Sequence, residues 1–284
     1  MNANLDAIAG TALRHIDESP HRVIPTELER YLRKTHNLNR SDAKTALRKL
    51  VLDGHLAYRW ELGHAFIERS FHHPVRTSEH VVLCPSGFPF YGEPDDALVI
   101  LEKGAAFGTG RHPTTQLSLK AIDRLLTKIN PWTDLSGTQI LDVGTGSGVL
   151  LFGAIRLGIN YGYGIDREPC AVYEAKQNAL LNRLDHRVHI SDTPLEGVHG
   201  RFDLICANLR FPTLIEFSKP FCDFLKQPGA LVLSGMKEEE VSEVTAVYGR
   251  LGVERLWRDR KNGWAALIFG NWRKAGRKLP GING

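Results

Sequence analysis

Cysteine is scarce in this chain. Four cysteines are spread over 284 residues, and none of them forms a C-x-x-C pair. This spacing argues against a disulfide framework or a cysteine metal site, and the His72-His73 pair has no further ligand motif beside it. We therefore expect buried thiols, a histidine pair at the surface and no bound metal.

Membrane and export signals are missing too. No apolar run approaches the roughly 18 residues that a membrane-spanning helix needs. The first residues, MNANLDAIAG, lack the charged-then-apolar pattern of a secretory signal. Hydrophobic residues nevertheless make up 42% of the chain, which is enough for real cores in two domains. We expect a cytoplasmic globular protein.

Acidic side chains are absent from the end of the chain. Residues 271–284 contain four Lys and Arg and no Asp or Glu, whereas residues 75–270 contain 21 basic and 23 acidic side chains and residues 1–74 contain 11 and 9. The net charge of +4 therefore comes from the two ends. Because the four cations stand among glycines, we expect a solvated, flexible tail, with contact to an acidic partner such as RNA as the alternative.

The most informative segment that is present has the sequence Asp-Val-Gly-Thr-Gly-Ser-Gly at residues 142–148. It follows an apolar strand pattern over residues 139–143 and precedes a helical pattern over residues 149–157. Its glycines allow a tight turn with no Cβ atom between backbone and ligand. Ligands of such α/β sheets lie outside the carboxyl ends of the strands, so the turn predicts a cofactor crevice. The glycines are Gly144, Gly146 and Gly148.

Carboxylates indicate which cofactor the crevice suits. A dinucleotide site has the pattern G-x-G-x-x-G, but this chain has G-x-G-x-G preceded by Asp142. That carboxylate would repel a pyrophosphate, whereas it can hold the ammonium of a methionine moiety, directly or through water. Asp166, about 20 positions on, can take both ribose hydroxyls. Asp192, after the next strand, has the acidic identity expected beside an adenine amine, although an ordinary loop aspartate is the alternative.

The pattern thus predicts an S-adenosylmethionine site. A nicotinamide cofactor is the weaker interpretation, and so is a glycine turn that binds nothing.

The pattern of the first 71 residues predicts a separate folding unit. Three helices followed by a β-hairpin are typical of a winged helix. The expected elements are helices over residues 5–16, 27–35 and 41–52, the last capped by Ser41, and strands over residues 55–61 and 64–70 joined across Leu62-Gly63.

Cations recur every four residues on the third expected helix, at Arg40, Lys44 and Arg48. A recognition helix reads a groove with such a stripe, but any solvated helix face also shows it, and acidic residues nearly balance the unit. Contact with nucleic acid therefore stays open beside protein contact or scaffolding. The apolar face of this helix is expected at Ala43, Ala46, Leu47, Leu50 and Val51.

Several short motifs mark the rest of the chain. They are His73-Pro74-Val75-Arg76, Val81-Val82-Leu83-Cys84-Pro85, AFGTGRHPTT at residues 106–115, Ala207-Asn208-Leu209, LVLSG at residues 231–235 and Gly263-Trp264. Together with the glycine loop, they make residues 72–270 resemble the ribosomal protein methyltransferase family called PrmA. Members of that family methylate amines on the stalk-base protein of the large ribosomal subunit. The segment at residues 106–115 is highly specific.

The resemblance implies the fold class and its division. An α/β, Rossmann-like, seven-stranded class I methyltransferase domain is expected at residues 106–270, after a connecting β segment at residues 72–105. Residues 1–71 would form a winged-helix-like substrate-recognition domain, and residues 271–284 the basic tail. Family members carry a small ferredoxin-type domain at the N-terminus, so a different adapter implies a different target.

The resemblance also implies cofactor contacts. Residues 107–110 have the composition of a flexible loop, and Thr114 can cap a helix over residues 115–129, so we expect a lid that closes over the cofactor. Arg111 stands where family members often have Thr or His, and would line the pocket mouth as a substrate contact. The family's contacts in this segment carry over to Phe107, Gly108, Thr109, His112 and Thr115.

The chemistry needs an aligned amine. A lysine must lose its proton, which from a pKa of about 10.4 costs roughly 4 to 5 kcal/mol at pH 7. A dry pocket lowers this cost. Asn208, at the end of an expected strand over residues 202–207, offers a carbonyl that can accept amine hydrogens, and it also borders the cofactor. We expect Asn208, His112 and Thr114 to form the catalytic group, with Leu209 and Phe211 beside the substrate.

One ambiguity concerns residues 208–211, Asn-Leu-Arg-Phe, which partly resemble the Asn-Pro-Pro-aromatic motif of enzymes that methylate base amines or glutamine amides. Both prolines are absent, so we expect Phe211 to pack in the protein. The favoured function is methylation of a lysine or α-amine of a protein. The alternatives are a nucleic-acid methyltransferase guided by residues 1–71 and the tail, and a regulator that binds adenosylmethionine and DNA without turnover.

Overall fold

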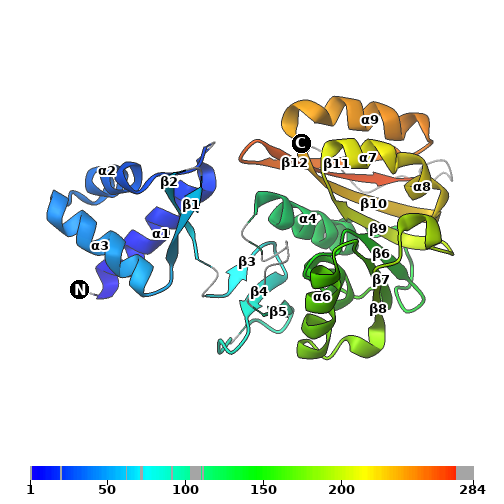
Figure 1. Cartoon of the computed structure of the whole chain (residues 1–284), viewed down its shortest axis with the longest axis horizontal. Coiled ribbons are helices and arrows are strands. Elements are labelled where there is room, and N and C mark those ends of the chain that lie inside the picture. Colours follow the sequence, from blue (N-terminus) through cyan, green and yellow to red (C-terminus); the bar gives the residue numbers. More distant parts are fainter. Residues whose placement is uncertain are drawn as a thin grey trace. The chain divides into compact units, whose positions relative to one another are not determined.

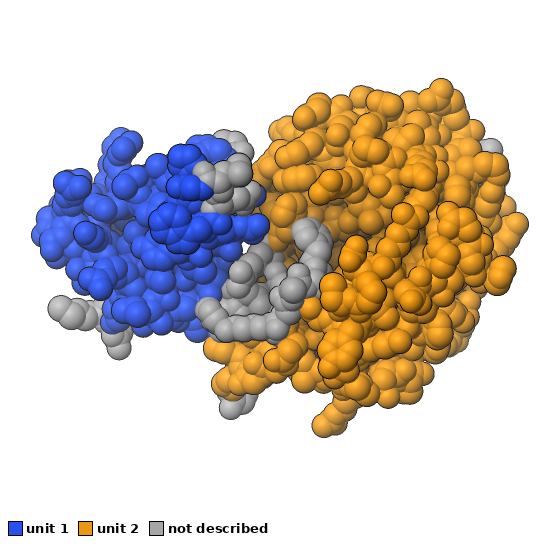
Figure 2. Space-filling model, in the orientation of Figure 1, with its two compact units in different colours: residues 1–74 blue, residues 75–284 orange. Residues whose placement is uncertain are grey.

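Figure 1 shows the computed structural model, which describes residues 2–19, 21–61, 63–70, 73–90, 92–102, 110 and 112–272. The chain divides into two compact units, residues 1–74 and residues 75–284 (Figure 2). Each unit packs around its own hydrophobic core. Within the described residues, no helix is long and apolar enough to cross a membrane.

Three helices and a hairpin make up the first unit. They are α1 (Asn2–Glu18), α2 (Pro25–His36), α3 (Arg40–Leu52), β1 (Leu56–Glu61) and β2 (His64–Arg69). Apolar side chains recur every three or four residues on the helices, and Leu28, Leu32 and Leu50 are fully buried between them. Glu61 pairs with His64, which leaves the predicted two-residue connection. The winged-helix assignment for this unit stays a prediction.

Helix α3 begins earlier than predicted, because its N-cap lies two positions before the predicted one. Asn39, and not Ser41, is the N-cap, because its Oδ1 accepts a hydrogen bond from the backbone N–H of Asp42 at 2.8 Å. Ser and Asn are comparably good caps, so residue type alone does not choose between them. The predicted apolar face is buried at Ala43, Ala46, Leu47 and Leu50, whereas Val51 is half-buried.

A small sheet opens the second unit. Its order is β3-β4-β5, with β3 (Val75–Arg76) antiparallel and β5 (Ala97–Leu101) parallel to β4 (Val81–Pro85). Helix α6 (Pro169–Leu181) borders β5 through two asparagines. The side-chain amide of Asn182 accepts from the N–H of Ile100 at 2.8 Å and donates to its carbonyl at 2.6 Å, as a neighbouring strand would.

The main sheet has seven strands in the order β11-β12-β10-β9-β6-β7-β8. Strands β6 to β10 are parallel, and β12 is antiparallel to both β10 and β11. The central strands are nearly continuous runs of buried residues, as expected when helices cover both faces. The bounds are β6 (Gln139–Val143), β7 (Tyr161–Ile165), β8 (Val188–Ser191), β9 (Phe202–Asn208), β10 (Leu225–Lys237), β11 (Glu254–Lys261) and β12 (Trp264–Gly270).

Helices flank this sheet in two groups (Figure 1). Helix α4 packs against α5, β10 and β12, whereas α7, α8 and α9 contact one another. The bounds are α4 (Pro113–Arg124), α5 (Val149–Arg156), α7 (Phe211–Glu216), α8 (Ser218–Asp223) and α9 (Val241–Arg250). The result is the predicted seven-stranded, Rossmann-like α/β domain.

Helix α4 differs from its prediction over residues 115–129. It begins at Pro113 and passes into a π-helical turn at Leu125–Ile129. Its N-cap is His112, and not Thr114, because the ring accepts a hydrogen bond from the backbone N–H of Thr114 at 3.3 Å. Proline at the first helical position has no N–H to satisfy, so the cap falls one residue before it.

Strand order reverses at the centre of the sheet. From β6 the chain builds outward through β7 and β8, and then returns to β9 on the other side of β6. Val143 pairs with both Ile165 and Ala207, and Ile165 pairs with Ser191. The residues that directly follow these four therefore form one row along the carboxyl edge of the sheet, where such sheets bind ligands. This row consists of Gly144, Asp166, Asp192 and Asn208.

Candidate active site

The glycine loop after β6 is fixed from both neighbouring strands. The N–H groups of Gly144 and Thr145 donate to the carbonyl of Ile165 on β7 at 2.9 and 3.0 Å. Gly144 has φ +73°, and a Cβ atom there would lie 2.6 Å from Leu209 Cδ2. The backbone conformation therefore favours glycine, and a side chain there would also displace the end of the Leu209 side chain. The loop lies against the segment that follows β9.

Asp142 is completely buried beneath this loop. Its Oδ2 accepts a hydrogen bond from Thr145 Oγ1 at 2.8 Å. Its Oδ1 is buried without a regular hydrogen bond from any described residue. The pKa of Asp142 is raised to about 7, chiefly by burial and to a smaller extent by the nearby charge of Asp166, against the lowering effect of the Thr145 hydroxyl. The N–H of Leu151 opposes this shift but is not placed to form a regular hydrogen bond.

An unpaired acceptor in a buried site needs a donor or a positive charge beside it. Asp142 Oδ1 is such an acceptor. The amino-acid end of S-adenosylmethionine carries an ammonium, and a carboxylate close by favours it directly or through a water molecule. The residues present therefore fit this group, and the fit uses an atom that the rest of the loop leaves unsatisfied.

Asp166 faces the same loop from the end of β7. Its Oδ2 accepts from the N–H of Gly146 at 2.8 Å, and its Oδ1 accepts from the N–H of Glu168 at 3.0 Å. These two bonds fix the carboxylate plane, and each oxygen has a second lone pair. A half-buried carboxylate held in this way can accept hydroxyl hydrogens from a ligand, as predicted for the ribose.

Asn208 ends β9 directly beside the glycine loop and is half-buried. The next residue, Leu209, donates its N–H to the carbonyl of Ser234 on β10 at 3.1 Å. Gly235 has φ +91°, and a Cβ atom there would lie 2.2 Å from the carbonyl oxygen of Leu209. The turn after Asn208 is therefore shaped by glycine on both sides, at Gly144 and at Gly235. Phe211, at the start of α7, packs against the core of the unit.

The start of α4 brings three more predicted residues together. His112 Nδ1 lies 2.8 Å from Thr114 Oγ1 and caps the helix. Thr114 and Thr115 are buried, and Thr115 Oγ1 has no hydrogen-bond partner among the described residues. Thr115 is thus a second buried polar group that is left unsatisfied, which fits its prediction as a cofactor contact.

Two residues of this region were missed from the sequence as site residues. Trp264 meets the His112 ring edge-on, with centroids 5.0 Å apart, and Lys237 Nζ lies 3.7 Å from the centroid of Trp264. The sequence marked Trp264 through the Gly263-Trp264 motif before the last strand, but no motif marked Lys237. The two pair across β10 and β12, and the cation–π contact depends on that long-range pairing.

Other predicted residues are not brought into contact. Asp192 stands in the edge row but is exposed. Several predicted positions lie outside the described residues: Phe107, Gly108, Thr109, Arg111, His72 and the tail cations Arg273, Lys274, Arg277 and Lys278.

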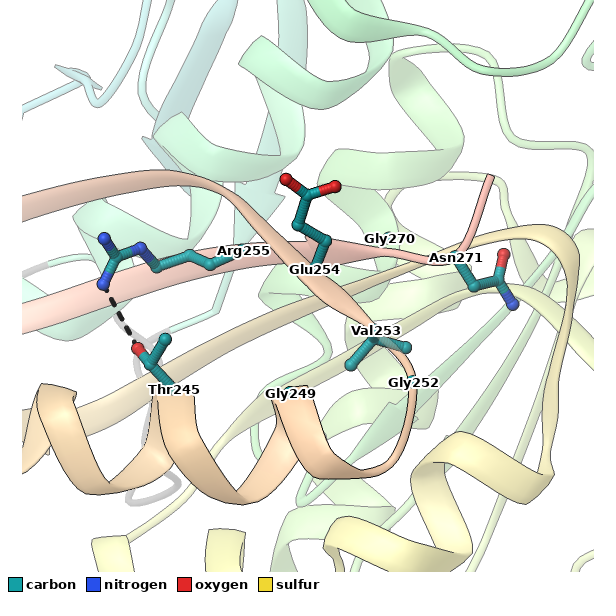
Figure 3. Close-up of a pocket in the computed structure, with 8 residues that line it drawn as sticks. All are labelled: Thr245, Gly249, Gly252, Val253, Glu254, Arg255, Gly270 and Asn271. Carbon is teal, nitrogen blue, oxygen red and sulfur yellow. Dashed lines mark hydrogen bonds between the residues drawn. The ribbon is translucent and has the colours of Figure 1, made fainter. Parts of the chain in front are cut away.

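A cavity of about 400 Å³ lies elsewhere, between α9 and the start of β11 (Figure 3). Thr245 and Arg255 meet across it, with Arg255 Nη1 donating to Thr245 Oγ1 at 3.2 Å. Gly270 also lines it and pairs with Ala230, far from the carboxyl end of β10. The cavity is therefore at the opposite edge of the sheet from the row that contains Asn208.

Comparisons with known proteins agree with this geometry. The model of the family "Ribosomal protein L11 methyltransferase (PrmA)" matches residues 48–271. The chain is 36% identical over 198 residues to ribosomal protein L11 methyltransferase of Geobacter sulfurreducens, covering 70% of this chain and 62% of that one. It is 31% identical over 225 residues to the protein of that name from Chloroflexus aurantiacus, covering 70% and 66%.

A solved structure is similar to the second unit. It is a ribosomal protein L11 methylase from Lactobacillus delbrueckii subsp. bulgaricus, with 26% identity and a TM-score of 0.62. The superposition covers 70% of this chain and 99% of that chain. The chain thus spans somewhat less than two thirds of the Geobacter relative, and its first 47 residues lie outside the family match.

Proposed function

We propose, from the premise that this chain belongs to the ribosomal protein L11 methyltransferase family, that it transfers a methyl group from S-adenosylmethionine to an amine of a protein. The observation that supports this most directly is the edge row, in which Asn208 ends strand β9, and β9 pairs with β6, the strand that leads into the glycine loop. The glycine loop and Asn208 are thereby adjacent. A cofactor methyl and an incoming nitrogen would meet at this edge.

The sulfonium, when bound, supplies an activated methyl group, so that the sulfur–carbon bond breaks as the nitrogen–carbon bond forms. The protein's contribution is then alignment and exclusion of water. Asn208 offers its side-chain carbonyl to a hydrogen of the neutral amine, which leaves the nitrogen lone pair to point at the methyl group. The proton of the ammonium form is lost to water before the attack.

We assign the remaining roles in the same way. Asp142 favours the ammonium of the cofactor, and Asp166 takes its ribose hydroxyls. Asp192 stands at the position for the adenine amine. Thr115 contacts the cofactor through its buried hydroxyl, and His112 with Thr114 sets the start of α4 beside it. On the acceptor side, Leu209 and Phe211 shape the turn, and Arg111 borders the pocket mouth.

The substrate class follows from the names of the relatives. Because the matched relatives are called ribosomal protein L11 methyltransferases, we propose a ribosomal protein as the acceptor, modified at a lysine side chain or an α-amine. A protein amine of this kind suits Asn208 as its hydrogen-bond acceptor, because the two prolines of the base-methylating motif are absent after Asn208.

The test is transfer of labelled methyl from adenosylmethionine to ribosomal subunits and to an extract that lacks this protein. We expect label that protease removes and nuclease leaves, and whose initial rate of incorporation falls about 100-fold with Asn208→Ala. Mass spectrometry then identifies the modified chain. Label removed by nuclease would overturn the proposal in favour of a nucleic-acid acceptor. Absence of label in both preparations, with cofactor binding intact, would overturn protein methylation as well.

A further inference from the structure

Charge is segregated within the first unit. Residues 21–52, which include α2 and α3, contain eight Lys and Arg against three Asp and Glu. The rest of residues 1–74 contains three against six. The small net charge of the unit therefore conceals one basic region and one acidic region, and a basic region of this kind attracts a polyanion.

The acidic groups inside the basic region are already engaged. Glu29 pairs with Arg40 at 3.7 Å, and Glu27 lies 3.1 Å from His21. Asp42 accepts from the side-chain amide of Asn39 at 2.8 Å. Each carboxylate thus has a close partner of its own, and none of these partners is Lys44, Arg48 or Lys49. Eight cations against three carboxylates leave the region with a net charge of +5.

Those cations lie on the outer face of α3. Lys44, Arg48 and Lys49 are exposed, and none of them forms an ion pair with a described residue. At 3.6 residues per turn, Arg48 shares the middle of that face with Ser41 and Thr45, and the two lysines flank it. The centre of this face thus carries hydroxyls and cations and no carboxylate. Hydroxyl and cationic side chains are the ones that contact base edges and phosphates.

The hairpin adds aromatic surface that the core does not explain. Tyr58 and Trp60 on β1 are 47% and 75% exposed. They alternate with Leu56 of the same strand, which is 1% exposed, so all three share one face. That face leaves the core towards the hairpin end. Large exposed aromatic side chains of this kind are typical of contact surfaces.

From these observations we propose that the first unit binds duplex DNA, with α3 in the major groove and the β1–β2 hairpin against the adjacent backbone. A 13-residue helix is about 20 Å long, which suits the wide major groove of B-form DNA. The deep, narrow major groove of an RNA duplex excludes such a helix. An apolar groove for a protein helix is not what the outer face of α3 presents.

This binding goes beyond methyl transfer. The family match begins at residue 48, so α1, α2 and Lys44 lie outside it, whereas Arg48, Lys49 and the hairpin lie within it. The surface is built by residues that the catalytic proposal does not use. Binding of DNA and transfer of methyl can therefore be measured and lost separately.

The test measures binding of the full chain to a fluorescent DNA duplex of about 20 base pairs, between about 50 and 200 mM salt. The decisive variant reverses two cations, Lys44→Glu with Arg48→Glu. We expect at least a tenfold loss of affinity at low salt, and a slope of log affinity against log salt that is smaller by about two. Trp60→Ala should weaken binding but leave that slope unchanged, because tryptophan carries no charge.

The matched control is Lys176→Glu with Arg201→Glu, which makes the same change of charge at exposed positions of the second unit. Both double variants keep the basic tail, so their difference reports α3 alone. Retained far-ultraviolet circular dichroism and retained binding of adenosylmethionine by the second unit show that each variant is folded. Equal losses in the two variants, equal affinity for an RNA duplex, or absence of duplex binding would each overturn the proposal.

Discussion

Asp142 links the pH dependence of folding to the site. The folded chain keeps a proton on this carboxylate up to about pH 7, whereas an unfolded aspartate releases it near 4. Between these values the unfolded state binds fewer protons, so stability falls as pH rises from about 4 to 7 and is level above that. The burial that prepares the site for a cation therefore destabilises the ligand-free protein at neutral pH.

Asp142→Asn should remove this dependence. The amide keeps the shape and cannot ionise, so the decrease in unfolding free energy between pH 5 and pH 8 should shrink by up to about 3 kcal/mol, because about two pH units of this interval lie below the folded pKa of Asp142, at roughly 1.4 kcal/mol per unit. Urea unfolding without cofactor at the two pH values measures it. Asp185→Asn, at an exposed position, is the control. An unchanged pH dependence in Asp142→Asn would contradict the role given to burial.

Asn208→Ala should slow methyl transfer with little effect on cofactor binding. Loss of the oriented carbonyl leaves the amine free to rotate, and misalignment of this kind costs about 100-fold in rate. Isothermal titration with adenosylmethionine and steady-state kinetics with the protein acceptor separate the two effects. Asn160→Ala, at an exposed position, should change neither. A Kd that weakens as much as kcat falls would make Asn208 a cofactor residue only.

Residues whose role is local could be predicted from sequence, and residues whose role depends on pairing could not. The glycine loop and Asp142 lie within seven positions, and both have the predicted placement. Trp264 and Lys237 meet only because β10 and β12 pair, which no local pattern reports. The cap of α4 was assigned wrongly to Thr114 because the proline at position 113 shifts the helix start.

At the scale of elements, we expect replacement by alanine to have opposite effects on stability at two glycines. A side chain at Gly235 would have φ +91° and a Cβ atom 2.2 Å from the Leu209 carbonyl. Gly235→Ala should therefore destabilise the protein by about 1–3 kcal/mol, the cost of backbone strain, and reduce transfer by moving the turn after Asn208. Gly249 in α9 has open space around its Cβ position.

Gly249→Ala is accordingly the matched control. In a helix it should stabilise the protein by about 0.5–1 kcal/mol and leave transfer unchanged. Thermal unfolding and labelled-methyl transfer of the two variants test both statements. Equal stabilities of Gly235→Ala and the unchanged protein would show that the turn at Leu209 yields without cost, and would remove the reason given for glycine there.

Asn178 on α6 connects the small sheet to the cofactor loop. Its Oδ1 accepts from the N–H of Glu102 at 2.9 Å, and its Nδ2 donates to the carbonyl of Ser147 at 3.0 Å. The side chain is fully buried, and Asn178→Ala removes both hydrogen bonds, at about 0.5–1.5 kcal/mol each. We expect lower stability and a raised KM for adenosylmethionine, with a smaller change in kcat.

Gln177→Ala, at the exposed neighbouring position, is the control for Asn178. Thermal unfolding and initial rates at varied cofactor concentration provide the measurement. A loss of stability with an unchanged KM would leave Asn178 a purely structural residue. Addition of saturating cofactor should recover most of the rate in Asn178→Ala, because the loop is displaced and not removed.

Elements were predicted best where one pattern suffices. The strand over residues 139–143 and the two-residue connection of the hairpin are confirmed, because a short apolar run and a turn glycine specify them locally. The parallel pairing of β4 with β5 was not predicted, since its edge is completed by Asn182, about 80 positions further on. The N-cap of α3 was wrong for a smaller reason, since two capping residues compete within three positions.

At the scale of the whole molecule, two separate cores predict two unfolding steps. Leu50 is fully buried in the first core and Leu233 in the second. Because adenosylmethionine binds to the second unit, it should raise the midpoint of one step only. At 100 times the Kd, mass action adds about 2.7 kcal/mol to the stability of that unit. Duplex DNA should raise the midpoint of the other step.

Core truncations assign the steps. Leu50→Ala and Leu233→Ala each remove a buried side chain at a cost of about 2–5 kcal/mol, and each should lower one midpoint and leave the other in place. Differential scanning calorimetry of the full chain, with and without cofactor, measures all four conditions. A single transition that shifts with either truncation and with cofactor would show that the units unfold together, and DNA bound at α3 would then stabilise the catalytic unit as well.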